Sequence, residues 1–142
     1  MRIVIDASVL VKWYVPEVHS GEAELLLNRR FELHAPELII PEFGNILWKK
    51  CKLGEISKEE SLVVADDMLK DDITLHPQSS LLRTSLDHAN TTGQTVHDWL
   101  YMALALSLGA AFVTADRRFF LAVRGTSYKS SIVWVENIPS LL

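Results

Sequence analysis

The chain has 142 residues, of which 49% are hydrophobic and 23% are charged, and its formal net charge at pH 7 is −4. This length fits a single domain over residues 1–142 with a sizeable core, and the composition excludes a disordered chain. The acidic balance argues against a general nucleic-acid coat, which would be basic, and the single cysteine, Cys51, excludes an internal disulfide.

The first half of the chain predicts two strands and three helices. Ile3–Ile5 is a β-branched run typical of a buried strand, and Glu32–Ala35 is a second candidate strand. Helical spacing of apolar residues predicts helices over Glu22–Arg30 and from Pro36 to the lysines before Gly54. Ser57 and Glu60 form a capping box that opens a third helix, which runs through Leu69.

The second half continues the alternation of strands and helices. Strands are predicted at Ile73–Leu75, Ala111–Val113 and Ile132–Val135, and helices at about Gln78–Ala89, from Thr95 to Gly109 and at Arg117–Val123. Strands that alternate with helices on short connections form a mostly parallel sheet covered on both faces. The predicted fold is therefore a three-layer α/β/α sandwich.

Neither apolar segment of the chain predicts a membrane anchor. Asp6 and Lys12 interrupt the apolar start, and no small-residue cleavage site follows, which excludes a signal peptide. The uncharged stretch Trp99–Val113 is shorter than a membrane span. We expect a cytoplasmic protein without membrane association.

Acidic residues stand where the predicted sheet would place a ligand crevice. Asp6 and Asp116 each follow a predicted strand, and the carboxyl ends of parallel strands meet at one crevice. Asp98 lies in the first turn of the helix that leads into the strand before Asp116. Glu42 lies among apolar residues of its helix, where a charge needs a partner or a metal ion.

Each acid except Asp6 also has a simple structural explanation. Asp98 can belong to a capping box with Thr95, Asp116 can cap the next helix, and Glu42 can face solvent. Asp6 is harder to explain, because strands disfavour aspartate and its neighbours are apolar. Taken together, four acids without a nearby set of Cys or His ligands indicate a hard cation, Mg²⁺ or Mn²⁺.

Four stretches of the chain resemble one protein family. They are IVIDASVLVKWYVPE (3–17), APELIIPEFGNILWK (35–49), VHDWLYMALALSLGAAFVTADRRF (96–119) and the strand at 132–135. In this order they resemble the PIN domain, specifically the VapC-like ribonuclease toxins of bacterial and archaeal toxin–antitoxin pairs. Two departures are His97, where the family more often has Tyr, and Gly44, where Ala is common and Gly would permit a close approach of another helix.

The resemblance assigns roles to the acids. Asp6 and Asp98 would bind Mg²⁺ or Mn²⁺ directly, and Asp116 and Glu42 would complete the site directly or through water. Thr114 or Ser8 would hold a ligand water or one of the acids. The implied reaction is endonucleolytic hydrolysis of RNA by metal-activated water, which leaves a 5′-phosphate and a 3′-hydroxyl.

The resemblance also implies partners, namely an RNA substrate, a second copy of the chain in a homodimer and a cognate antitoxin. The antitoxin would lay an apolar segment in a groove, for which Trp48 with the neighbouring lysines and Trp13-Tyr14 are candidates. A basic rim could meet RNA phosphates, although scattered solvated charge explains the same residues equally well. These residues are Lys12, Lys49, Lys50, Lys52, Arg117, Arg118, Arg124 and Lys129.

Three other functions share parts of this pattern. A catalytically silent PIN module would bind RNA or a partner without cutting. A phosphatase of the haloacid-dehalogenase type would need a second Asp at the position of Ser8. A phospho-acceptor receiver domain would need an early pair of adjacent acids and a late lysine, and neither is evident.

Overall fold

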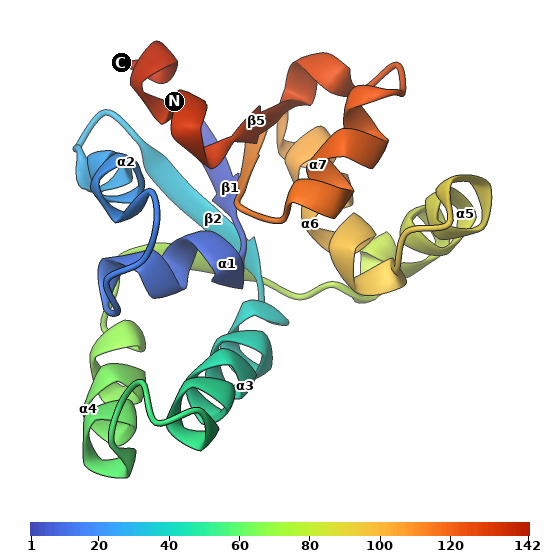
Figure 1. Ribbon diagram of the computed structural model, residues 1–142. Helices are drawn as coiled ribbons and strands as arrows, with labels where there is room; N and C mark the ends of the chain where they lie inside the picture. Colours follow the sequence, from blue (N-terminus) through green and yellow to red (C-terminus); the bar gives the residue numbers. More distant parts are fainter.

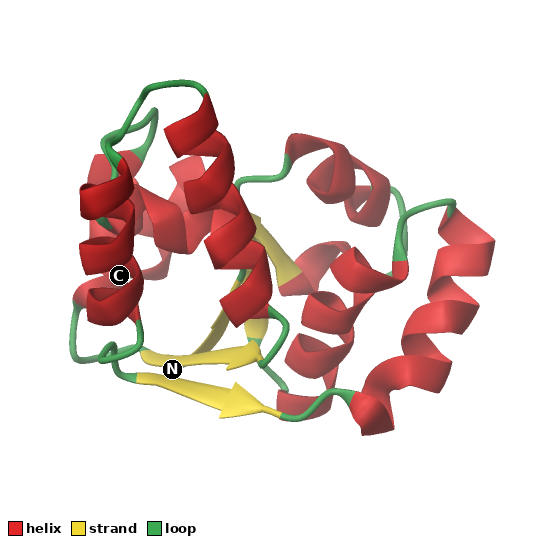
Figure 2. Ribbon diagram, turned by 90° about the horizontal axis from the view of Figure 1, so that it is seen from below, coloured by secondary structure: helices red, strands yellow, loops and turns green.

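The computed structural model describes all residues from Met1 to Leu142 and contains one five-stranded parallel sheet. The strands lie in the order β3-β2-β1-β4-β5, and every neighbouring pair is parallel. Their bounds are β1 Arg2–Ile5, β2 Glu32–Pro36, β3 Ile73–His76, β4 Ala111–Thr114 and β5 Ile132–Trp134. Figure 2 shows the strands side by side among the helices. The predicted α/β fold is confirmed.

The β-branched run at the N-terminus is central because it can be buried on both faces. Ile3, Val4 and Ile5 are all fully buried, as expected for the middle strand of a covered parallel sheet. Val4 pairs with His34 of β2 on one side and with Phe112 of β4 on the other.

Helices cover both faces of the sheet, with α1 and α2 on one side and α6 and α7 on the other (Figure 1). The α-helices are α1 Ala7–Leu10, α2 Ser20–Glu24, α3 Ile39–Lys52, α4 Lys58–Met68, α5 Leu82–Thr92, α6 Val96–Leu108 and α7 Arg117–Arg124. Short 3₁₀ segments are η1 Val11–Trp13, η2 Leu25–Leu27, η3 Ser79–Leu81, η4 Lys129–Ser131 and η5 Val135–Leu141. No helix has the length and apolar character needed to cross a membrane.

The connections from β1 and β4 leave toward opposite faces of the sheet, to α1 and α7 respectively (Figure 1). Because these two strands are neighbours, their carboxyl ends open a crevice at a topological switch point. This is the edge at which Asp6 and Asp116 follow their strands.

Helix α6 anchors one layer of the core. Its residues from Trp99 to Ala105 are all buried, which is why the sequence is apolar on every side of this helix. The Trp99 ring meets Phe119 of α7 edge to face, with centroids 5.4 Å apart, and Tyr101 stacks on Phe112 of β4.

Two predicted helix starts were wrong. The helix expected from Pro36 begins at Ile39, because Pro36 is still the last residue of β2 and is paired with His76 of β3. The helix expected at about Gln78 begins at Leu82, after the 3₁₀ turn η3, and it continues to Thr92. Gly93 ends it with a φ of 74°, which glycine adopts without strain.

Three further segments differ from the prediction. The helix expected over Glu22–Arg30 is the shorter α2, which lies earlier and gives way to the 3₁₀ turn η2. β5 ends at Trp134, because Val135 already belongs to η5. The apolar residues after Asp6 form α1 and η1, which the sequence pattern did not assign.

Candidate active site

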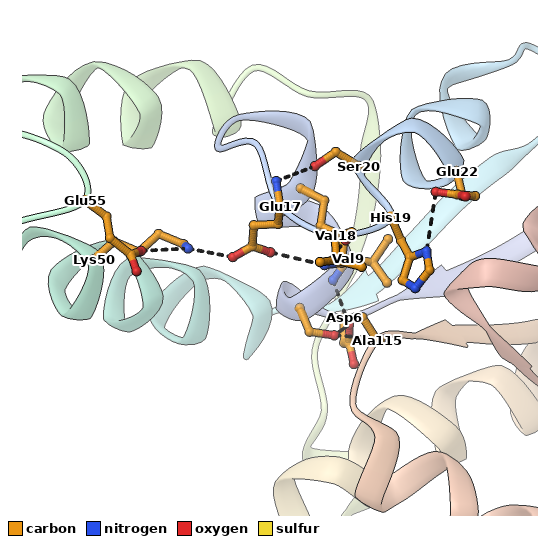
Figure 3. Close-up of polar contacts among 12 residues, drawn as sticks. Asp6, Val9, Glu17, Val18, His19, Ser20, Glu22, Lys50, Glu55 and Ala115 are labelled. Atoms are coloured by element: carbon orange, nitrogen blue, oxygen red, sulfur yellow. Dashed lines mark hydrogen bonds and ion pairs between the residues drawn. The ribbon is translucent and has the colours of Figure 1, made fainter. Parts of the chain in front are cut away.

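Asp6 lies directly after β1 and is the N-cap of α1. Its Oδ1 accepts a hydrogen bond of 3.1 Å from the backbone N–H of Val9, which explains locally why an acid ends this strand. The residue is only 8% exposed. Figure 3 shows Asp6 between the contact with Val9 and the chain at Ala115.

Two hydroxyl groups hold Asp6 from both sides. The Ser8 hydroxyl donates to Oδ1 and the Thr114 hydroxyl donates to Oδ2, each at 2.5 Å. The same hydroxyl oxygens accept the backbone N–H groups of Ala115 and Asp116, at 3.1 and 3.0 Å. Each hydroxyl therefore connects the acid after β1 to the turn after β4.

The other three acids come from three different helices. Asp116 is the N-cap of α7 and accepts the N–H of Phe119 at 3.1 Å. Asp98, in the first turn of α6, accepts the hydroxyl of the N-cap residue Thr95 at 3.0 Å. Glu42, in the first turn of α3, has its own partner across the cavity and is not a purely solvated residue.

One cavity of about 240 Å³ brings the four predicted acids together. Its lining residues are Asp6, Ala7, Ser8, Glu42, Asn45, Ile46, Lys49, Asp98, Tyr101 and Asp116. Thr114 is fully buried behind Asp6 and does not line the cavity, whereas His97 is exposed and lies outside the lining.

The carboxylates of the cavity are close enough to affect one another's protonation. Burial raises the pKa of Asp6 to about 6, and the charge of Asp116 adds to this, while hydrogen bonds from Ser8 and Thr114 act in the opposite direction. Burial also raises the pKa of Asp98, and the charges of Asp116 and Glu42 raise it further. The cavity therefore concentrates negative charge that a cation would relieve.

The donor set fits a hard divalent cation. No three acidic, histidine or cysteine side chains are close enough to hold a metal ion as they stand. Mg²⁺ does not require such a cage, because it usually keeps several waters and is held by one or two carboxylates. All four acidic donors in the cavity are carboxylates, and neither cysteine nor histidine lines it, which suits Mg²⁺ or Mn²⁺ rather than a softer metal.

Three further polar residues line the cavity, of which sequence reasoning missed Tyr101 and Asn45 and expected Lys49 only as part of the basic rim. Tyr101 donates its hydroxyl to Glu42 at 2.5 Å, and burial followed by the Glu42 charge raises the pKa of this phenol far above its usual range. Asn45 and Lys49 belong to the same helix as Glu42. Helical spacing could have found them, since Tyr101 is three residues after Asp98 and the other two follow Glu42 by three and seven.

The lysines near the end of α3 have different surroundings. Lys50 forms ion pairs with Glu17 and Glu55 (Figure 3). Glu17 also pairs with Lys12. The Lys52 ammonium lies over the Trp48 ring, 5.3 Å from its centroid. Three of the predicted rim cations, Lys12, Lys50 and Lys52, thus have partners within the chain.

An apolar groove between α3 and α4 contains Trp48 but neither of the other two aromatic candidates. Its lining residues are Gly44, Leu47, Trp48, Cys51, Lys52, Lys58, Ser61, Leu62 and Ala65. Trp13 instead donates its indole N–H to the carbonyl of Ala23, and the Tyr14 hydroxyl donates to Asp71. The expected close helix approach at Gly44 was also wrong, because a Cβ there would meet open space.

The chain matches one known protein family over most of its length. The PIN domain family matches residues 3–125. The chain is 32% identical to Ribonuclease VapC3 of Pyrobaculum aerophilum over 120 residues, which cover 83% of this chain and 92% of the relative. It is 28% identical to Exonuclease VapC9 of the same organism over 130 residues, which cover 88% of each chain.

Solved structures agree with the fold. The crystal structure of PAE2754 from Pyrobaculum aerophilum has a TM-score of 0.74 at 24% identity and covers 99% of this chain and 98% of that chain. The crystal structure of Mycobacterium tuberculosis VapC20, described as a Sarcin-Ricin loop cleaving toxin, has a TM-score of 0.66 at 14% identity. The match covers 84% of this chain and 94% of that chain. The chain belongs to the PIN-domain family, among its VapC ribonuclease homologues.

Proposed function

We propose that this chain is a Mg²⁺- or Mn²⁺-dependent endoribonuclease, acting as one domain over residues 1–142, and the toxin of a type II toxin–antitoxin pair. The observation that carries the proposal is the single cavity lined by Asp6, Glu42, Asp98 and Asp116. Four elements that are distant in sequence contribute these acids, and the relatives named above are nucleases.

Asp6 is the centre of the proposed site. Ser8 and Thr114 fix both of its oxygens, so the carboxylate keeps one orientation while its cavity side meets the ligand. Asp98 is the second proposed ligand, and Asp116 and Glu42 act on the ion directly or through water. Tyr101 positions Glu42 by its hydroxyl.

The proposed reaction is hydrolysis of an RNA phosphodiester. A bound divalent cation would supply an activated water and would neutralise charge on the phosphate. The water oxygen forms a bond to phosphorus, the bond from phosphorus to the 3′ oxygen breaks, and that oxygen takes a proton. The products are a 5′-phosphate and a 3′-hydroxyl.

Cleavage of linear and circular RNA tests the proposal. We expect the purified chain to cut both forms in Mg²⁺ or Mn²⁺ and neither form in EDTA. Asp6→Asn and Asp98→Asn should abolish cleavage, whereas Asp87→Asn, which removes an exposed acid of α5 outside the cavity, should not. Cleavage of linear RNA alone would instead indicate an exonuclease, as the name of one relative suggests.

The same assay separates the alternatives. A silent PIN module would bind RNA and leave it intact under all conditions. A phosphatase of the haloacid-dehalogenase type would need a second Asp at position 8. Ser8 occupies that position, where its hydroxyl donates to Asp6 and accepts the N–H of Ala115.

Two protein partners belong to the proposal. An apolar antitoxin segment would dock in the groove between α3 and α4, where Trp48 is 58% exposed and Leu62 is 59% exposed. Trp48→Ser should weaken co-purification with the antitoxin without changing RNA cleavage. The chain itself is proposed to be a homodimer, and light scattering on the purified protein would show twice the monomer mass.

A further inference from the structure

A second hollow lies beside α7 and has no assigned role. Its volume is about 510 Å³, and we call it the α7 groove. Its lining residues are Arg117, Phe120, Leu121, Arg124, Lys129, Ile132, Trp134, Glu136 and Asn137. Figure 1 shows α7 beside β5, the two elements that form most of its walls.

One face of α7 forms a wall of the groove. Arg117, Phe120, Leu121 and Arg124 follow the helical spacing of three, four and seven residues and therefore share that face. An arginine stands at each end of the wall, with apolar side chains between them. The wall is about 12 Å long, which is the rise of eight helical residues.

The α7 groove is basic in a chain that is acidic as a whole. Its three cations are Arg117, Arg124 and Lys129, all exposed, and none of them takes part in an ion pair. Glu136 is the only carboxylate in the lining. Like Lys49 in the acidic cavity, these three cations belong to the predicted basic rim, form no ion pair within the chain and lie in a concave surface.

Aromatic rings accompany this positive charge. Phe120 and Trp134 are partly exposed, and their ring centroids are 5.7 Å apart at an angle of 38°. Cations that can meet phosphates beside aromatic surfaces that can stack on bases are the combination with which proteins bind single-stranded nucleic acid.

The α7 groove begins at the acidic cavity. Arg117 directly follows Asp116, which lines that cavity, and α7 then leads away from it. Trp134 pairs with Thr114, so its place is at the same edge of the sheet as the acids. A strand of RNA whose scissile phosphate lies at the acids can therefore continue along this groove.

We propose that the α7 groove binds single-stranded RNA next to the cleavage site, an inference that rests on the proposed nuclease function. Arg117, Arg124 and Lys129 contact phosphates, and the rings of Phe120 and Trp134 stack on a base. The charge favours a polyanion, and the position beside the acidic cavity favours the substrate itself over an acidic protein segment.

RNA binding by a cleavage-silent chain tests the proposal. In the Asp6→Asn background, the Kd for a fluorescent single-stranded oligonucleotide is measured over a range of salt concentrations. Arg124→Gln and Lys129→Gln should each weaken binding several-fold and reduce the slope of log Kd against log salt by about 0.7, the value for one phosphate contact in a single strand. The matched control is Arg118→Gln, an exposed residue of the same helix outside the groove.

A kinetic assay in the otherwise wild-type chain adds a second readout. Arg124→Gln should raise KM and leave kcat unchanged. Arg124 lies at the far end of α7 from Asp116, outside the acidic cavity, so in the proposal it does not touch the reacting phosphate. Trp134→Leu should also raise KM, whereas Trp134→Phe, which keeps an aromatic face, should restore most of the affinity.

Three results of the binding and oligomeric-state measurements would overturn the proposed role of the α7 groove, and an unchanged KM would be a fourth. They are an equal loss in Arg118→Gln and Arg124→Gln, a salt slope that none of the groove variants changes, and a change of oligomeric state in Arg124→Gln, which would assign the groove to a second copy of the chain. If the wild-type chain cleaves RNA with an unchanged KM in Arg124→Gln, only the groove is refuted. If the wild-type chain neither cleaves nor binds RNA, the proposed function itself fails.

Discussion

Replacing Asp6 by asparagine should make the metal-free protein more stable at neutral pH, although it abolishes the proposed activity. Most substitutions of a buried, hydrogen-bonded residue do the opposite. The reason here is the raised pKa of Asp6, which burial and the charge of Asp116 bring from 3.8 to about 6. The folded chain therefore holds this carboxylate in its charged form at a cost in free energy.

The size of the effect follows from the pKa difference. A gap of about two pKa units corresponds to about 3 kcal/mol of folding free energy. The Asp6→Asn variant loses part of this gain. Its amide nitrogen cannot accept the hydrogen bond that the Thr114 hydroxyl donates to Oδ2 in the wild type. One lost hydrogen bond costs about 1 kcal/mol, so the expected net gain is about 1 to 2 kcal/mol.

The gain should depend on pH in a defined direction. Below the unfolded pKa of 3.8 both states bind the proton and the group contributes no pH-dependent difference. Between 3.8 and about 6 the folded chain binds a proton that the unfolded chain lacks, so the wild type loses stability as pH rises through this window. The advantage of Asp6→Asn should therefore be complete above pH 6 and should disappear near pH 4.

Urea unfolding in EDTA measures the prediction, with Asp87→Asn as the control for removing an exposed acid. A lower unfolding free energy for Asp6→Asn than for the wild type at neutral pH, with the control unchanged, would refute the reasoning. Adding Mg²⁺ should reverse the order of stability, because an ion that binds only the folded state raises the wild-type Tm by mass action. An equal shift in both proteins would show that Asp6 is not a ligand.

Three further predictions concern other parts of the molecule. Gly44→Ala should raise the unfolding free energy by about 0.5–1 kcal/mol, measured by urea titration, because the helix gains propensity and the new methyl group meets open space. Glu17→Gln should lower it by about 1–2 kcal/mol, since Glu17 alone joins Lys12 and Lys50, and a loss that is absent in high salt would confirm an electrostatic cause. His34 should titrate below its usual pKa of 6.5 in an NMR pH series, because burial and the neighbouring His76 disfavour its charged form. Stability from this group should therefore fall as pH drops below 6.5, and a His34 resonance that titrates above 6.5 would contradict this.

The sheet was predictable because its signals are local. A β-branched run such as Ile3–Ile5 and an uninterrupted apolar stretch such as that of α6 each indicate burial without reference to the rest of the chain. The errors lie where tertiary contacts override the local pattern. Pro36 starts many helices, but here pairing with His76 keeps it in β2, and no local signal in the sequence reports that pairing.

The acids show what sequence can and cannot say about a site. Asp116 is an N-cap, so its simple structural explanation is correct, and it also lines the cavity. Asp98 lies in the first turn of α6 as expected, but its carboxylate accepts the Thr95 hydroxyl instead of closing a capping box, and it lines the cavity too. A carboxylate that caps or contacts a helix end can still line a cavity, so a structural role for an acid does not argue against a place in the proposed site. The contact between Tyr101 and Glu42 joins residues 59 positions apart and depends on how α3 and α6 pack.

The arrangement of Asp6 with its two hydroxyl neighbours has an evolutionary consequence. Selection for catalysis would keep the Asp6 carboxylate, which the proposed reaction needs. Selection for stability alone would remove it, because its buried charge lowers the free energy of unfolding. Ser8 and Thr114 share this one acceptor, so mutations at the two positions should be epistatic, each changing the fitness effect of the other. A lineage that no longer needed the activity would drift first at Asp6, and its proteins would become harder to denature as they became inert.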